Sequence, residues 1–194
     1  MKKSWNTVFI SGGGSGIGLF LARVLAARGS RIAIFDLHIS EQIRSELGSA
    51  NGAGCSFAEV DICDAQLLEE AVARVISEIG APDLAVNSAG IQVAKAFLEI
   101  SADEFARVIN INLIGSRNFA AAVLPHMHRG GRLALVASLA GLVSNYTYSA
   151  YNASKFGVVG LAGALRMDCL PRGIAVSVIC PPEVKTPIDR KSVV

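Results

Sequence analysis

Tyr151 and Lys155 stand four residues apart, and Ser138 lies thirteen residues before the tyrosine. Side chains four apart on a helix share one face, so the phenol and the amine of this pair can meet. A free phenol titrates near ~10, and a neighbouring cation favours its charged form. A hydroxyl from another segment, such as that of Ser138, could hold a substrate oxygen beside the phenol. These three residues therefore predict proton transfer to or from an alcohol or carbonyl oxygen.

The same residues also have ordinary explanations. Tyrosine and lysine are common on helix surfaces, and a serine at the end of a strand can simply cap a turn. The prediction of a catalytic site therefore depends on the elements and motifs around these residues.

Apolar segments of strand length alternate with longer amphipathic segments along the chain. The apolar segments are continuous, which is typical of strands in a parallel sheet that is covered on both faces. The expected strands are 7–11, 31–36, 54–60, 84–87, 132–138 and 174–180. The expected helices are 16–28, 40–47, 65–79, 102–127 and 152–170. The alternation predicts an α/β fold, a doubly wound (Rossmann) parallel sheet of about six strands with helices on both faces.

A glycine cluster follows the first expected strand and leads into a helix. It reads Ser11-Gly12-Gly13-Gly14-Ser15-Gly16-Ile17-Gly18. Glycines let the backbone turn sharply and approach a pyrophosphate, which the N–H groups of the helix start can then bind. The cluster lacks the Gly-Lys-Ser/Thr ending of a loop that binds nucleoside triphosphates. We therefore expect a dinucleotide here, held by Gly12, Ser15, Gly16, Ile17 and Gly18.

Asp36 ends the second expected strand, 18 residues after Gly18. A carboxylate at this position can accept both hydroxyls of an adenosine ribose and would repel a 2′-phosphate. No arginine or lysine stands at residues 15, 37 or 38 to bind that phosphate. The pattern therefore favours NAD over NADP. Asp61, after the third strand, has two open roles: contact with the adenine, or capping of the next helix, for which Asp64 competes.

Composition excludes several other classes of protein. Of 194 residues, 52% are hydrophobic and 18% are charged, with a net charge of +2, which indicates one globular domain over residues 1–194. The basic residues are scattered, so no nucleic-acid partner is expected. No apolar run reaches the length of a membrane span or of a signal sequence, which predicts a cytoplasmic protein. The four cysteines have no metal-ligand spacing, and no metal site is expected.

Together, these motifs resemble the short-chain dehydrogenase/reductase family over nearly the whole chain. The glycine cluster is similar to the family's cofactor loop, and Asn87-Ser88-Ala89-Gly90 is similar to its fourth-strand motif. Asn112, Ser138, Tyr151 and Lys155 fall on the positions of its four catalytic residues. Pro181-Pro182-Glu183-Val184-Lys185-Thr186 is similar to the segment that packs on the nicotinamide, in a variant that resembles ketosphinganine reductases.

The resemblance implies an NAD-dependent oxidoreductase that interconverts a secondary alcohol and a ketone. Tyr151 would act as general acid and base, Lys155 would favour its phenolate and bind the nicotinamide ribose, and Ser138 would orient the reacting oxygen. Asn112 would hold a proton-relay water at a kink in its helix. Further cofactor contacts are implied for Ile62, Asn87, Ala89, Gly90, Pro181, Val184 and Thr186. Taken singly, Asn112 could be an ordinary polar residue, and Thr186 could cap the segment that follows it.

The family normally continues past the equivalent of Val194 with a substrate-covering loop and a seventh strand, and we expect this chain to be without both. One of the family's two usual subunit interfaces uses that strand. The other uses helices expected here at 102–127 and 152–170, which carry small residues, so a homodimer through them is expected. The alternatives are a truncated NAD-binding sensor or scaffold without catalysis, and a purely structural module. A mostly apolar wall with phenolic tips is expected to face the substrate: Gln92, Val93, Leu139, Val143, Tyr146 and Tyr148.

Overall fold

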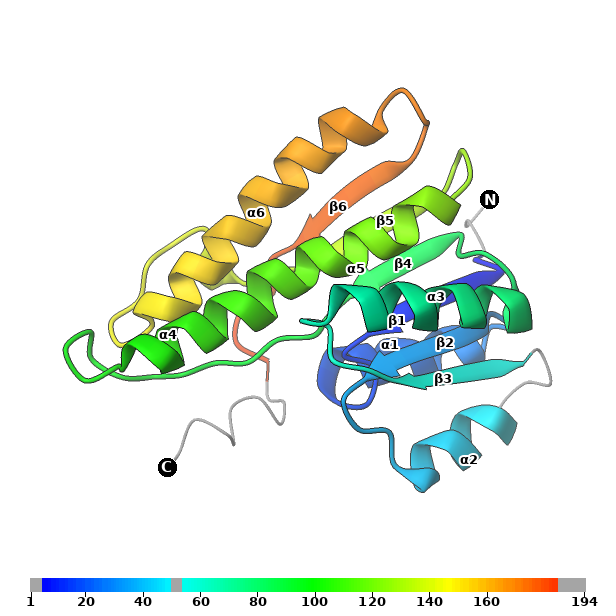
Figure 1. The fold of residues 1–194 in the computed structure, drawn as a ribbon, viewed down its shortest axis with the longest axis horizontal. Coiled ribbons are helices and arrows are strands. Elements are labelled where there is room, and N and C mark those ends of the chain that lie inside the picture. The colour runs from blue at the N-terminus through cyan, green and yellow to red at the C-terminus, as the bar shows by residue number, and fades with distance from the viewer. Residues whose placement is uncertain (1–4, 50–53, 185–194) are drawn as a thin grey trace.

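The computed structural model describes residues 5–49 and 54–184 of the chain. Within these ranges six parallel strands form one sheet in the order β3-β2-β1-β4-β5-β6 (Figure 1). The strands are β1 (Thr7–Ser11), β2 (Arg31–Asp36), β3 (Cys55–Glu59), β4 (Leu84–Asn87), β5 (Arg132–Val136) and β6 (Ala175–Ile179). The direction of winding reverses between β1 and β4, and this reversal is where open α/β sheets bind ligands. The predicted doubly wound fold is confirmed.

Helices cover both faces of the sheet because successive residues of each strand point to opposite sides. Val8 and Ile10 pack with α1 (Gly16–Ala26) and α2 (Glu41–Ser49) on one face. Phe9 packs on the other face with α3 (Ala65–Ile79), α5 (Gly115–Val123) and α6 (Ser149–Cys169). Both cores are apolar, which accounts for the continuous hydrophobic strands.

The expected helix 102–127 is not one uniform α-helix. It begins as α4 (Ala102–Ile109), passes through a π-helical turn at Asn110–Ile114, continues as α5, and ends in a 3₁₀ turn at Leu124–His126. π-Helical turns inside helices often occur at functional sites. The interruption places one of the predicted catalytic residues, Asn112, in the wider turn.

Smaller differences from the expected bounds occur at several other elements, and two of these elements adjoin the cavity. β5 ends at Val136, two residues before Ser138, and α6 begins at Ser149, three residues before the expected start. None of the described helices combines the length and apolarity needed to cross a bilayer.

Candidate active site

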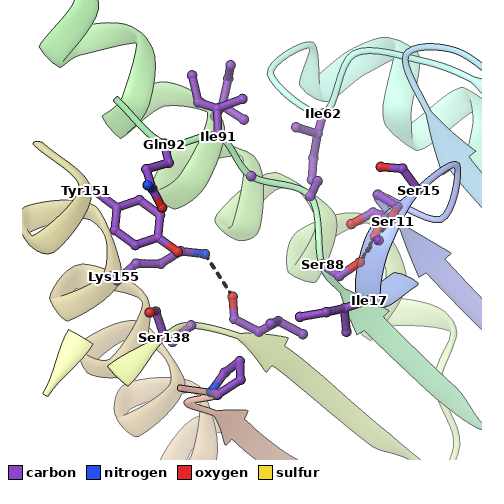
Figure 2. Close-up of a pocket in the computed structure, with 18 of the residues that line it drawn as sticks. Ser11, Ser15, Ile17, Ile62, Ser88, Ile91, Gln92, Ser138, Tyr151 and Lys155 are labelled. Carbon is purple, nitrogen blue, oxygen red and sulfur yellow. Dashed lines mark hydrogen bonds between the residues drawn. The ribbon is translucent and has the colours of Figure 1, made fainter. Parts of the chain in front are cut away.

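A cavity of about 620 Å³ lies at the carboxyl ends of the strands. Most of its lining comes from the segment after each of the six strands and from α6 with the residues just before it. Figure 2 shows part of this lining. Thirteen of the predicted cofactor-binding residues line it: Gly12, Ser15, Gly16, Ile17, Asp36, Asp61, Ile62, Ala89, Gly90, Tyr151, Lys155, Pro181 and Val184. The fold therefore gathers most of the predicted site in one place.

The glycine loop is shaped by close contacts that exclude side chains. Gly12 has φ 67°, and a Cβ there would lie 2.5 Å from the backbone nitrogen of Ala89. A Cβ on Gly18 would lie 2.3 Å from the carbonyl oxygen of Gly12. Gly18 does not line the cavity. Because Gly18 has no side chain, α1 can pack directly against the loop. Gly18 therefore shapes the loop and does not itself border the cavity.

The N-terminus of α1 can bind an anion. Ser15 is the N-cap, its side chain makes no capping hydrogen bond, and the first turn contains no acidic residue. The first N–H groups of a helix have no partner within the helix and carry partial positive charge. The loop and helix start therefore fit the pyrophosphate of a dinucleotide.

Asp36 holds the glycine loop from the end of β2. Its Oδ2 accepts a hydrogen bond from the backbone N–H of Gly14 at 2.8 Å, and the side chain lines the cavity. Among the described lining residues the only cation is Lys155, at the other end of the cavity. A carboxylate without nearby basic side chains fits a ribose with free hydroxyl groups.

The structure decides which aspartate caps α3. Asp64 is the N-cap, and its Oδ1 accepts from the backbone N–H of Leu67 at 3.0 Å. Asp61 instead accepts from the N–H of Cys63 at 2.8 Å and lines the cavity, so its contact with adenine stays a prediction. Asn118, which sequence reasoning missed, fixes this segment through hydrogen bonds to the carbonyl oxygens of Ile62 and Cys63.

Tyr151 and Lys155 lie together on α6 (Figure 2). The Nζ of Lys155 is 5.6 Å from the centroid of the Tyr151 ring. The lysine side chain is buried, 5% exposed, and its Nζ donates a hydrogen bond to the carbonyl oxygen of Val136 at 3.0 Å. Burial lowers the pKa of the Lys155 amine to about 8, against an opposing effect of the nearby Cys180. The amine of Lys155 therefore lies beside the Tyr151 ring in the same cavity, and its effect on the phenol stays a prediction.

Ser138 follows β5 and faces the same part of the cavity as Tyr151 (Figure 2). Its Oγ accepts a hydrogen bond from the backbone N–H of Ala140 at 3.1 Å, at the start of the 3₁₀ turn Leu139–Gly141. Ser138 therefore caps this turn, which is the non-catalytic role that the sequence also allowed. A hydroxyl oxygen that accepts from the backbone can still donate its own proton into the cavity.

Asn112 lies behind the cavity, fully buried in the π-helical turn. Its side chain makes two hydrogen bonds to the backbone of Ile91 and one to Ser154 Oγ. Its carbonyl oxygen accepts from Ser116 Oγ at 2.5 Å. The residue joins the segment after β4 to α6, and the predicted proton-relay water stays a prediction.

Asn87 is also buried behind the lining, where its side chain bonds to Ser11 Oγ and Ser116 Oγ. Thr186 lies outside the described residues. Of the residues expected to face the substrate, Gln92, Leu139 and Tyr148 line the cavity, whereas Val93, Val143 and Tyr146 do not. No group of three or more potential metal ligands occurs in the part of the chain that the structure describes.

The short chain dehydrogenase family profile matches residues 6–193, so the chain belongs to this family of NAD(P)-dependent oxidoreductases. It is 35% identical to the oxidoreductase UcpA of Salmonella typhimurium over 191 residues, 96% of this chain and 72% of that protein. It is 36% identical to the 3-dehydrosphinganine reductase TSC10B of Arabidopsis thaliana over 93% of this chain and 55% of that protein.

Solved structures show the same fold. An NAD-bound short chain dehydrogenase from Mycobacterium paratuberculosis superimposes with a TM-score of 0.89 at 29% identity, covering 95% of this chain and 74% of that chain. Carveol dehydrogenase from Mycobacterium avium, also in complex with NAD, superimposes with a TM-score of 0.88 at 28% identity. The match covers 94% of this chain and 72% of that chain.

Proposed function

We propose that this chain interconverts a secondary alcohol and a ketone by hydride transfer with NAD, and that Tyr151 is its acid/base. The observation that carries the proposal is the buried amine of Lys155, 5.6 Å from the Tyr151 ring centroid, inside the cavity at the ends of the strands. NAD would supply the hydride acceptor for oxidation and, as NADH, the donor for reduction. The side chains supply position and protons.

In oxidation the alcohol oxygen lies between the Ser138 hydroxyl and the Tyr151 phenol. Ser138 donates a hydrogen bond to that oxygen, and Tyr151 Oη takes its proton. The Lys155 ammonium stabilises the phenolate that precedes this transfer, since a cation close to a phenol favours its charged form. In reduction the same Oη gives the proton back.

The cavity divides into parts that fit the parts of NAD. The glycine loop and the start of α1 would bind the pyrophosphate, Asp36 the adenosine ribose, and Asp61 with Ile62 the adenine. Lys155 and the segment with Val184, which also line the cavity, would border the nicotinamide. The carboxylate of Asp36 supports a preference for NAD over NADP, because a 2′-phosphate would meet a like charge.

The proposal is tested with the wild-type chain, a panel of secondary alcohols and ketones, and both dinucleotides. NAD should bind by calorimetry, and absorbance should show NADH formed from at least one alcohol. Binding of NAD without turnover of any compound would favour a non-catalytic sensor or scaffold instead.

We further propose that a second copy of the chain packs on α6. Five exposed positions of this helix recur at helical spacing and form an apolar face: Ala153, Phe156, Gly160, Ala164 and Met167. The exposed charged residues Arg166 and Asp168 lie at its C-terminal end. Phe156 is 44% exposed, and a Cβ on Gly160 would meet nothing within 4 Å. The exposed Ile114 at the π-helical turn extends the apolar character toward α4, which packs against α6. A symmetric homodimer would cover this face.

A further inference from the structure

Gln92 and Tyr148 form a polar pair next to the proposed reacting phenol. Gln92 follows β4 and Tyr148 precedes α6, and both line the cavity. Gln92 Nε2 donates a hydrogen bond to the Tyr148 hydroxyl at 3.1 Å. The rings of Tyr148 and Tyr151 have centroids 6.0 Å apart, and Figure 2 shows the Gln92 side chain extending toward the Tyr151 ring. One small molecule can therefore contact both the pair and Tyr151.

The pair keeps hydrogen-bonding capacity for a ligand. The Tyr148 hydroxyl accepts from Gln92, and among the described residues its own proton has no acceptor. The Gln92 carbonyl oxygen likewise has no donor among them. Turning the amide over exchanges these roles but again leaves at least one donor and one acceptor for a ligand. A donor beside an acceptor is the complement of a hydroxyl group, which both gives and takes a hydrogen bond.

The backbone holds Tyr148 in place. Thr147, directly before it, has φ 68°, a left-handed conformation that is unfavourable for a branched side chain. Its carbonyl oxygen accepts from the backbone N–H of Lys95 at 2.9 Å, and Lys95 and Tyr148 form an isolated β-bridge. Unfavourable conformations persist where surrounding contacts impose them, and they cluster at ligand-binding sites.

The charges around the pair favour an uncharged ligand group. Lys155 is the single cation among the described lining residues, and its Nζ is engaged with Val136. The Lys95 amine forms an ion pair with Glu104 at 2.5 Å. Glu183 adds a negative charge to the lining. A substrate carboxylate would find no free cation at this position, whereas a hydroxyl needs none.

We propose that Gln92 and Tyr148 are specificity-determining residues that bind a second, uncharged hydroxyl of the substrate. The substrate class is then a diol, or the corresponding hydroxyketone, rather than a simple alcohol or a hydroxy acid. This inference rests on the proposed oxidoreductase function, because it places the first oxygen at Tyr151.

The test compares matched compounds that differ by one hydroxyl. We would measure kcat/KM with NAD for 2-butanol, 2,3-butanediol, 1,3-butanediol and 3-hydroxybutyrate. The wild type should prefer a diol to 2-butanol by about tenfold or more, since a site with unpaired polar groups rejects the analogue that lacks the hydroxyl. Tyr148→Phe and Gln92→Leu should each remove most of that preference. Tyr146→Phe, the same change at a residue 84% exposed and outside the lining, should keep it.

A second measurement separates this inference from the proposed function. Thermal shift of the Tyr151→Phe chain with NADH and the same compounds reports binding without turnover. If no compound is oxidised but the diol still binds better than 2-butanol, and Tyr148→Phe removes the difference, the subsite stands and the proposed reaction fails. If alcohols are oxidised with no diol preference, or if the preference survives Tyr148→Phe, the subsite is wrong. Preference for 3-hydroxybutyrate would also overturn it.

Discussion

Asn112 forms two hydrogen bonds with the backbone of Ile91. Its Oδ1 accepts from the Ile91 N–H at 2.8 Å, and its Nδ2 donates to the Ile91 carbonyl oxygen at 2.9 Å. The same Nδ2 donates to Ser154 Oγ at 2.9 Å. Asn112 therefore fixes the segment that carries Gln92 against the helix that carries Tyr151.

Replacing Asn112 with alanine should destabilise the fold by about 2–4 kcal/mol, because it leaves several buried polar groups without partners. Urea unfolding gives this free energy. Asn110→Ala is the matched control, since Asn110 lies in the same turn with an exposed side chain, and its cost should stay within about 0.5 kcal/mol. Equal small effects at both positions would show that the contacts of Asn112 contribute little.

The burial of Lys155 makes stability depend on pH. The folded pKa of about 8 lies below the unfolded value of about 10.4, so between these values the unfolded chain binds more protons and stability rises with pH. Below pH 8 the folded state carries the full cost of the buried charge. Lys155→Met lacks this effect. The unfolding free energy of wild type should therefore rise relative to that of Lys155→Met by roughly a few kcal/mol between pH 7 and pH 10.

Urea unfolding of wild type and Lys155→Met at both pH values checks this difference, and groups common to both proteins cancel. A constant difference would mean that the lysine titrates at its ordinary value. Lys155→Met should also lack turnover at every pH, because no ammonium then stabilises the Tyr151 phenolate.

Asp36 is expected to act through both its charge and its hydrogen bond to the Gly14 N–H. Asp36→Asn keeps an acceptor for that N–H and removes the charge, whereas Asp36→Ala removes both. Calorimetry should show the ratio of NAD to NADP affinity falling by roughly a hundredfold in both variants, since repulsion of the 2′-phosphate is lost. Only the alanine variant should also lose thermal stability. A wild-type chain that binds both dinucleotides equally would refute the assigned preference.

The proposed dimer is tested at Phe156. Phe156→Glu places a charge in the apolar face of α6, and sedimentation velocity should show a shift from dimer to monomer, since an unpaired buried charge is costly. Phe20→Glu is the control, because Phe20 on α1 is exposed but lies on the opposite face of the sheet. A monomeric wild type would contradict the proposal directly.

The strands and most of the cavity lining could be predicted because they follow from local rules. Strands buried on both faces are continuous apolar segments, and β1, β2 and β4 have the expected bounds. The ends of parallel strands meet at one edge, so glycines and aspartates that follow strands converge there.

The features of the site that could not be predicted depend on tertiary contacts, which leave no clear pattern in the sequence. The π-helical turn inside the expected helix 102–127 accompanies the hydrogen bonds of Asn112 to Ile91 and Ser154, which are distant in sequence. The end of β5 at Val136 frees Ser138 to cap a turn. Two further tertiary contacts are equally invisible in the sequence. Lys155 donates to the Val136 carbonyl oxygen, and Asn118 donates to the carbonyl oxygens of Ile62 and Cys63.

The most direct test of the account is single-turnover hydride transfer by Tyr151→Phe. This change removes only the phenolic oxygen, so NAD should bind with nearly the wild-type affinity, while the rate of NADH formation should fall by about a hundredfold to ten-thousandfold. Tyr146→Phe should change neither quantity. If Tyr151→Phe forms NADH at the wild-type rate, Tyr151 does not transfer the proton and the central claim is wrong.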